Sequence, residues 1–348
     1  MSERRPELQR DGLAVRKERL YGRLLALCAV LTIAVSVGIV LALAGETLNF
    51  FSQVSFVDYI TGTNWSPVVG DPVFGVLPLV SGTLIITVVS ALIALPIGLG
   101  IAIYLSEYAS ERVRSVLKPS LEILAGVPTV IYGYFALVYL TPILDAPLPI
   151  SQTLIPEWLG FSLPVIPGGV PLLPEFTLVV SEFTFVIPSL RTFNVLSASV
   201  VVGIMVIPMV SSISEDALSS VPDSLREAAY GLGSTKFDVS TKVVVPAATS
   251  GIISSYVLAL SRAIGETMAV TIAAGQSPKL PAFPDIFVNL TESTQTITAA
   301  MVQIAQAESR SGVLLESMFA LGLTLFAITL IMNILAEGIR RRYREEYS

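Results

Sequence analysis

The chain has 348 residues, of which 53% are hydrophobic and 14% are charged. Its mean hydropathy of +0.75 indicates more apolar surface than the core of one water-soluble protein of this length can bury. This composition excludes an ordinary soluble enzyme, a disordered chain and a collagen-like chain. The sequence has 0 His and 1 Cys, so the usual ligands of metal sites and the CxxC redox motif are missing. The net charge of -6 argues against nucleic acid as a partner. A membrane protein without a metal site is predicted.

Six apolar stretches are long enough to cross a membrane, because roughly 20 apolar residues span about 30 Å of hydrocarbon. We predict membrane-spanning helices at residues 22–44, 77–105, 121–142, 193–213, 248–274 and 313–337. Most Lys and Arg residues fall in the segment 1–21, in the tail 338–348, and after the second and fourth spans. The positive-inside rule therefore predicts a multi-pass protein of the cell membrane with both ends in the cytoplasm.

The first span has an alternative interpretation as a secretory signal, because basic residues precede it and Ala42-Leu43-Ala44 resembles a cleavage site. The apolar run from Leu24 to Ala44 is longer than the roughly 7 to 15 residues of a signal's apolar region. We therefore expect a retained helix.

The two long segments expected outside the membrane have a different composition. Residues 45–76 are rich in aromatic residues and turn formers, and residues 143–190 combine Pro and Gly with short β-branched runs such as Thr177-Leu178-Val179-Val180. The second segment is suited to a small hairpin or cap. The predicted fold is an all-α polytopic membrane protein, with five of its six spans in a core at 77–337 and an irregular outer loop that has room for β structure.

The most specific local pattern lies in the predicted cytoplasmic loop 214–246. It consists of Glu-Ala-Ala, three residues, Gly, nine residues, and an apolar triplet followed by Pro, with the members Glu227, Ala228, Ala229, Gly233 and Pro246. Asp223 or Ser224 is available to cap a short helix, the two alanines leave a shallow surface, and Gly permits a tight turn. Such a helix suits docking into a groove of a cytoplasmic protein. The alternative is a solvated linker helix.

The chain has no G-x-x-x-x-G-K-[ST] pattern, so it does not bind ATP through a phosphate loop of that kind. If transport is driven by ATP, the ATPase is another polypeptide. We expect no cofactor in this chain and no enzyme activity of its own.

Arg262 and Glu266 lie near the middle of the fifth predicted span, where a charged side chain costs about 2.5 to 3.5 kcal/mol and generally faces a bundle interior or a wet cavity. On one helix, both would share a face with small residues. One interpretation is a neutralising pair that joins helices. The other is that Arg262 binds an oxyanion. Glu266 would then orient Arg262 or accept a hydrogen bond from a protonated oxyanion, which would favour phosphate over sulfate.

Three segments carry a family resemblance: residues 261–270 (SRAIGETMAV), residues 124–134 (LAGVPTVIYGY) and residues 225–230 (LREAAY). They resemble phosphate ABC importer permeases, and the Glu-Ala-Ala loop resembles the EAA loop of ABC importers. The ending Met268-Ala269-Val270 is similar to the PstC-type subunit rather than to its PstA-type partner. The resemblance covers about residues 74–337 and is weak in the first span and the outer loops.

The resemblance implies a type I ABC importer (MetI-like) permease core formed by spans two to six. It implies four further components: a PstA-type second permease, two cytoplasmic PstB-type ATPases that bind ATP and Mg, and an extracytoplasmic PstS-type phosphate-binding protein. It associates Arg262 and Glu266 with the phosphate path, and we take the neighbouring Ser261 and Thr267 as further candidates for the path. The further path candidates Glu122, Thr129, Tyr132 and Tyr134 have an alternative interpretation as helix-packing and interfacial residues.

The expected function is therefore an ATP-driven phosphate import permease that works by alternating access, with the EAA loop carrying ATPase motion into the spans. Three alternatives stay open. They are a permease for sulfate, molybdate or another anion, a secondary transporter without an ATPase, and a structural or regulatory membrane subunit.

Overall fold

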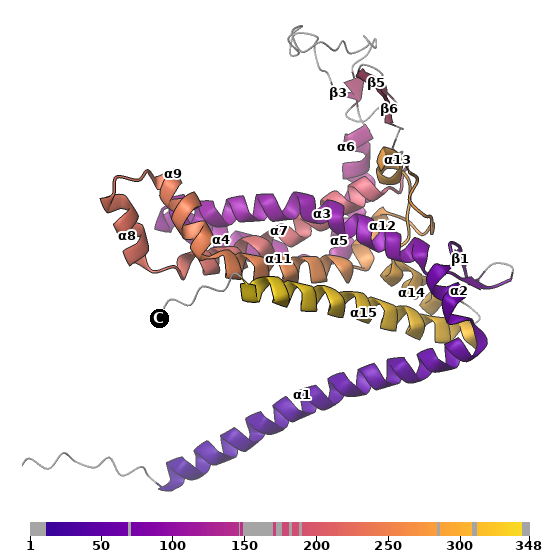
Figure 1. Ribbon diagram of the computed structural model, residues 1–348, viewed down its shortest axis with the longest axis horizontal. Helices are drawn as coiled ribbons and strands as arrows, with labels where there is room; N and C mark the ends of the chain where they lie inside the picture. The colour runs from indigo at the N-terminus through magenta and orange to yellow at the C-terminus, as the bar shows by residue number, and fades with distance from the viewer. Residues whose placement is uncertain are drawn as a thin grey trace, which may run out of the picture.

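The computed structural model describes residues 12–68, 71–145, 147–148, 170–171, 176–180, 183–187, 190–283, 286–307 and 312–342. Its centre is a bundle of apolar helices that lie side by side (Figure 1). These are α3 (Leu77–Ile103), α7 (Val195–Ser219), α11 (Thr249–Ile264) and α15 (Val313–Arg342). Helix α1 (Gly12–Gln53) joins the bundle at its C-terminal end and diverges from it toward its N-terminus.

The predicted number of spans agrees with the described helices. By length and composition 4 helices qualify as spans, or up to 6 if each of two bent helix pairs counts as one. The bent pairs are Glu111–Ala125 with Thr129–Asp145, at 88°, and Lys236–Ala247 with Thr249–Ile264, at 71°. The largely helical, polytopic fold is confirmed.

The third predicted span, 121–142, is divided rather than straight. Helix α4 (Glu111–Ala125) begins before the predicted start and ends at Gly126, and α5 (Thr129–Phe135) starts after Pro128. Proline disfavours a helical conformation in the residue before it, which explains why the helix stops there. The π-helical turn η2 (Ala136–Leu140) and α6 (Thr141–Asp145) follow.

The fifth predicted span, 248–274, is also wrong as a single helix. It is preceded by α9 (Lys236–Val239), the π-helical turn η5 (Ser240–Val244) and α10 (Val245–Ala247). Helix α11 then ends at Ile264 with Gly265 as its C-cap, and a separate short helix, α12 (Met268–Ala273), follows. Glycine is a poor helix former, so the helix is easily interrupted at Gly265. The hydropathy pattern does not reveal this interruption.

Residues 45–76 are more ordered than a loop. Helix α1 continues to Gln53, and α2 (Phe56–Thr61) is followed by the antiparallel strands β1 (Trp65–Ser66) and β2 (Val73–Phe74). Their aromatic side chains form a buried cluster with α14 (Ile297–Gln306) and α15. The aromatic composition of this segment therefore serves packing at one end of the bundle.

Most of the predicted outer loop 143–190 lies outside the described residues. Within it, β3 (Pro147–Leu148) pairs antiparallel with β4 (Val170–Pro171), and β5 (Phe176–Val180) pairs antiparallel with β6 (Phe183–Ile187). The β-branched run at 177–180 is thus in a hairpin, and the expectation of β structure in this loop is confirmed.

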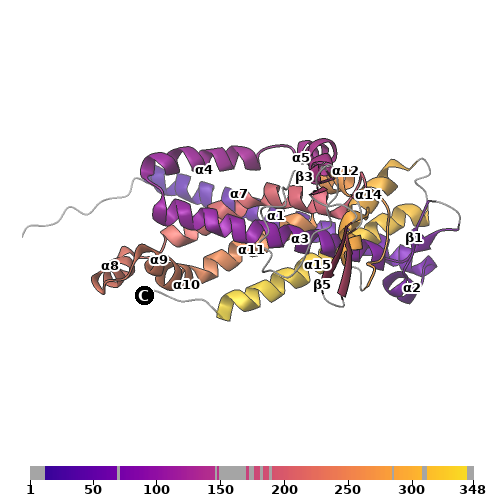
Figure 2. The same ribbon diagram turned by 90° about the horizontal axis from the view of Figure 1, so that it is seen from above.

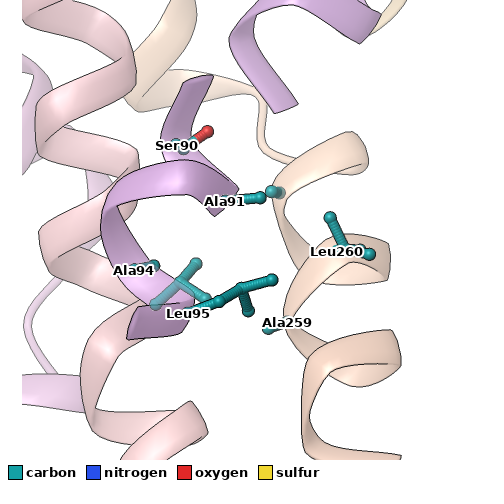
Figure 3. Close-up of a pocket in the computed structure, with 8 residues that line it drawn as sticks. Ser90, Ala91, Ala94, Leu95, Ala259 and Leu260 are labelled. Atoms are coloured by element: carbon teal, nitrogen blue, oxygen red, sulfur yellow. The ribbon is translucent and has the colours of Figure 1, made fainter. Parts of the chain in front are cut away.

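Small residues bring the central helices together. The pocket in Figure 3 lies between α3, α7 and α11, and its lining consists of Ser90, Ala91, Ala94, Leu95, Val206, Ala259, Leu260 and Ala263. The Ser90 hydroxyl donates to the backbone oxygen of Ile86. No charged side chain lines this pocket, so we interpret it as a packing gap rather than as an ion-binding site.

Candidate functional site

The break between α11 and α12 separates the two charged residues that were expected on one helical face. Arg262 lies in the last turn of α11, whereas Glu266 follows the C-cap Gly265. The Glu266 N–H donates to the Ala263 oxygen at 3.3 Å, a tightened turn instead of a continued α-helix. The expectation of one uninterrupted helix face is therefore wrong at this point.

Glu266 is buried, with 7% of its surface exposed. Its Oε1 accepts a hydrogen bond from the Ala269 N–H at 3.1 Å, at the start of α12. A carboxylate is stabilised there because the first N–H groups of a helix have no partner within it. The Glu266 backbone oxygen accepts from the Thr298 hydroxyl at 2.8 Å, which attaches the break to α14. Within the described part of the chain, Oε2 has no hydrogen-bond partner.

Arg262 is exposed. Among the residues that the structure describes, its guanidinium has no ion-pair partner, and it does not pair with Glu266. The neutralising-pair interpretation therefore has no support in the geometry. A cation in the last turn of a helix is favoured by the backbone carbonyls, but at membrane depth it needs water or an anion. The guanidinium retains all five of its N–H donors for such an anion.

The two neighbouring polar candidates make local contacts. The Ser261 hydroxyl donates to Asn333 Oδ1 of α15 at 3.2 Å, and the Thr267 hydroxyl donates to the Gly265 oxygen at 3.2 Å. Each hydroxyl has used its single proton, so neither is free to donate to an anion in this arrangement. Their contacts hold the ends of the break in place.

The motif at 124–134 lies against the break, although it is far away in sequence. A Cβ added at Gly133 would lie 2.9 Å from Ala269 Cα, so α5 and α12 are in backbone contact. The buried Tyr132 donates its hydroxyl to the Leu124 oxygen at 2.8 Å and thereby bridges the end of α4 to α5. This contact gives Tyr132 a structural role at the second helix break.

The remaining path candidates, Thr129, Tyr134 and Glu122, lie on α4 and α5. Thr129 is half-buried at the first position of α5. Tyr134 is exposed on α5. Glu122 is exposed on α4 and lines a surface pocket with Arg114 and Lys118. Among the residues that the structure describes, Glu122 makes no hydrogen bond or ion pair with Arg262 or Glu266.

The loop between α7 and α11 contains the short helix that the sequence predicts. Helix α8 (Asp223–Gly231) has Ala229 on its buried side and Glu227 and Ala228 exposed. Gly233 has φ +84°, so the prediction of a tight turn that favours glycine is confirmed. The expected cap is wrong: the N-cap is Pro222, and no side chain caps the helix. Pro246 lies in the first turn of α10, where its missing N–H costs nothing.

Comparison with known proteins decides the family. Residues 94–345 match the family described as binding-protein-dependent transport system inner membrane component. The chain belongs to this family. It is a multi-pass membrane permease subunit of a transport system.

The relatives of this permease have similar lengths. It is 31% identical over 328 residues to the probable ABC transporter permease protein YqgH of Bacillus subtilis, covering 93% of this chain and 92% of the relative. It is 31% identical over 316 residues to the phosphate transport system permease protein PstC of Mesorhizobium japonicum, covering 90% and 87%. With PstC of Xylella fastidiosa strain 9a5c the identity is 34% over 292 residues, covering 83% and 82%.

Among solved structures, the permease resembles a chain of a bacterial ABC transporter involved in the import of the acidic polysaccharide alginate. The TM-score is 0.56 at 16% identity, and the match covers 95% of this chain and 97% of that chain. At that identity the likeness concerns the fold alone, and it confirms the type I importer architecture.

Two charged residues that the sequence did not mark as functional candidates, Arg226 and Glu215, join helices in the structure. The Arg226 guanidinium, on α8, pairs with Glu107 at 3.1 Å and donates to the Leu218 oxygen at 2.8 Å. Glu215, on α7, has a fully buried carboxylate that pairs with Lys118 at 2.6 Å and with Arg114. The spacing of Arg114 and Lys118, one helical turn apart on α4, is the signal that could have indicated a buried acidic partner.

Proposed function

We propose that this chain is a permease subunit of an ATP-driven importer for inorganic phosphate. The observation that carries the proposal is the exposed Arg262 guanidinium, which has no ion-pair partner among the described residues, at the helix break that contains the buried Glu266. The family membership and the phosphate transport names of relatives that align with most of the chain support it.

The chemistry at the break favours phosphate among oxyanions. Arg262 supplies positive charge and paired donors that fit the oxygens of a tetrahedral anion. Glu266 keeps Oε2 available as an acceptor, while Oε1 is held by α12. Monohydrogen phosphate has a proton to donate to that oxygen, whereas sulfate at neutral pH has none and would meet an unpaired carboxylate. Glu266 would thus select against sulfate, and Arg262 would attract the phosphate anion.

The complex that we propose has the composition of an ABC importer. A second permease of PstA type completes the path, two PstB-type ATPases in the cytoplasm bind ATP and Mg, and a PstS-type binding protein delivers phosphate. Helix α8, with Glu227 and Ala228 on its exposed side, docks on an ATPase. This orientation puts both chain ends in the cytoplasm, as the distribution of Lys and Arg also requires. The chain supplies the path and the coupling, not the hydrolysis.

The test is uptake of labelled phosphate by transport-null cells that carry this chain with its partner subunits. We expect Arg262→Gln to reduce uptake by more than about tenfold, because loss of a charged hydrogen bond costs about 1.5 to 3 kcal/mol. Arg341→Gln is the matched control, because Arg341 is exposed and, within the described residues, its ion-pair partner is Glu337 of the same helix. Membrane insertion of each variant is checked by immunoblot of isolated membranes.

The same assay separates the alternatives. Excess sulfate should leave wild-type uptake unchanged and should compete in Glu266→Gln. Normal uptake by Arg262→Gln would remove Arg262 from the path. Failure of the intact complex to take up phosphate would point to sulfate, molybdate or another oxyanion. Uptake without the ATPase subunits would indicate a secondary transporter.

A further inference from the structure

The carboxylate of Glu215 is the centre of an ionic cluster between α7 and α4. Its side chain is 0% exposed. Oε2 accepts from Lys118 Nζ at 2.6 Å, and Oε1 accepts from the Arg114 guanidinium and from the Ser219 hydroxyl at 3.0 Å. We call Glu215, Arg114, Lys118 and Ser219 the Glu215 clamp. Both carboxylate oxygens are satisfied, and both cations come from α4.

The clamp joins α4 to a fully buried side chain of α7. Helix α4 lies along α7 (Figure 2), yet none of its residues is buried. Apolar packing therefore contributes little to holding α4 on the bundle. A buried ion pair is a weak source of net stability, but it favours one register, because the fully buried Glu215 carboxylate meets both of its cations only there. Lys118 also pairs with the exposed Asp216 at 2.8 Å, which ties the same turn of α4 to α7. The clamp thus determines where α4 lies on α7.

A second contact joins the same end of α7 to α8. The Arg226 side chain is 15% exposed and its partner Glu107, in η1 (Tyr104–Tyr108) at the end of α3, is 5% exposed. Arg226 also donates to the backbone oxygens of Leu218 and Val221, just past the clamp. We call these contacts the Arg226 bridge. The last carbonyls of a helix have no partner within it, so a guanidinium satisfies them and holds α8 in a defined position.

We propose that the Glu215 clamp and the Arg226 bridge make α4, the C-terminal end of α7 and α8 one rigid block. Movement of α8 is then delivered through α7 to α4, and from α4 to the break that Tyr132 bridges beside α12. Glu215 and Arg226 are positioning residues for transport. Their role in coupling rests on the proposed function, since it assumes that α8 is moved by an ATPase.

The rigid block is tested in the reconstituted complex with spin labels on α4 and α8. Cys28→Ser removes the native thiol, and Val116→Cys and Ser224→Cys place labels at two exposed positions. Electron spin resonance then gives the distance distribution without nucleotide and with trapped ATP. We expect the same distribution in both states for otherwise native protein. In Glu215→Gln, and separately in Arg226→Gln, trapping ATP should shift the mean by more than about 2 Å, the scale of helix displacements in switching proteins.

Glu111→Gln is the matched control, because it removes an exposed carboxylate from α4 outside the clamp and should behave as native. Two separate variants guard against a folding defect in either one. If the distance is independent of nucleotide in both Glu215→Gln and Arg226→Gln, or if it already changes in native protein, the rigid block is refuted. A native-like result for Glu111→Gln together with a shift in either variant supports it.

Phosphate uptake per ATP hydrolysed is measured on the same preparations. We expect the clamp and bridge variants to lower this ratio on the order of tenfold, a common size for coupling between sites. Absence of phosphate uptake in the native complex would overturn the proposed function alone, because the distance measurement does not depend on the transported ion. Native uptake ratios in both variants would overturn the role of the block in coupling.

Discussion

The contact between α5 and α12 predicts a specific effect of adding one methyl group. In Gly133→Ala the new Cβ would lie 2.9 Å from Ala269 Cα, 3.0 Å from the Ala269 oxygen and 3.1 Å from Ile272 Cβ, where ordinary contacts are 3.4–4 Å. Two of these atoms are backbone, so no rotamer change relieves the overlap. Overpacking of this kind costs about 1 to 3 kcal/mol. Since α12 begins directly after the break that follows Arg262, phosphate uptake should fall as well.

Gly100→Ala provides the matched control. Gly100 is also helical, but an added Cβ there meets nothing within 4 Å. Both substitutions gain about 0.5 to 1 kcal/mol from the better helix propensity of alanine. The difference between the two variants in unfolding free energy, measured by denaturant titration in detergent, therefore isolates the steric cost. If Gly133→Ala is as stable as Gly100→Ala and transports normally, α5 and α12 do not pack as closely as the structure has them.

Two further predictions concern loops and ends of the bundle. A hydrogen bond from Lys279, opposed in part by burial, lowers the pKa of the Glu292 carboxyl below 4.5. The ionised Glu292 therefore contributes stability above about pH 4.5, and this contribution is lost as pH falls through the lowered pKa. Lys279→Gln should lower the melting temperature more at pH 7 than at pH 3, and an equal loss at both would contradict this. Burial raises the pKa of Tyr59 to about 12, so its hydroxyl stays protonated in the folded protein and keeps its 2.9 Å contact with Thr324. Tyr59→Phe should cost about 1 kcal/mol by thermal unfolding at pH 7. It should cost less at pH 10, because the unfolded phenol, with a pKa of about 10, begins to ionise there while the folded one does not; an equal cost at both pH values would contradict the raised pKa.

Several features of the permease were accessible from the sequence because they depend on local properties. Apolar length identifies the spans, since the hydrocarbon thickness sets the number of residues that a helix needs. The composition around Gly233 predicts both the short helix and the turn, because a positive φ strains any other residue. Arg262 and Glu266 were recognisable as candidates because charge is expensive at membrane depth.

The arrangement of those candidates was not accessible in the same way. Hydropathy runs through the breaks at Gly126 and Gly265 without interruption, so it predicts straight spans where the chain turns. The backbone contact of Gly133 with Ala269 depends on two segments that are far apart in sequence. Whether Arg262 pairs with Glu266 depends on the helix ending between them, and the structure shows that it does end.

Glu215 is a clear example of a property that the sequence alone does not determine. In the sequence it is an acidic residue at the end of an apolar stretch, where solvent exposure is the ordinary expectation. In the structure it is fully buried, because Arg114 and Lys118 of α4 lie opposite and satisfy both of its oxygens. Length, hydropathy and turn chemistry are properties of one segment, and the sequence determines them by itself. Burial and charge pairing are properties of two segments, and only the packing of α4 on α7 decides them.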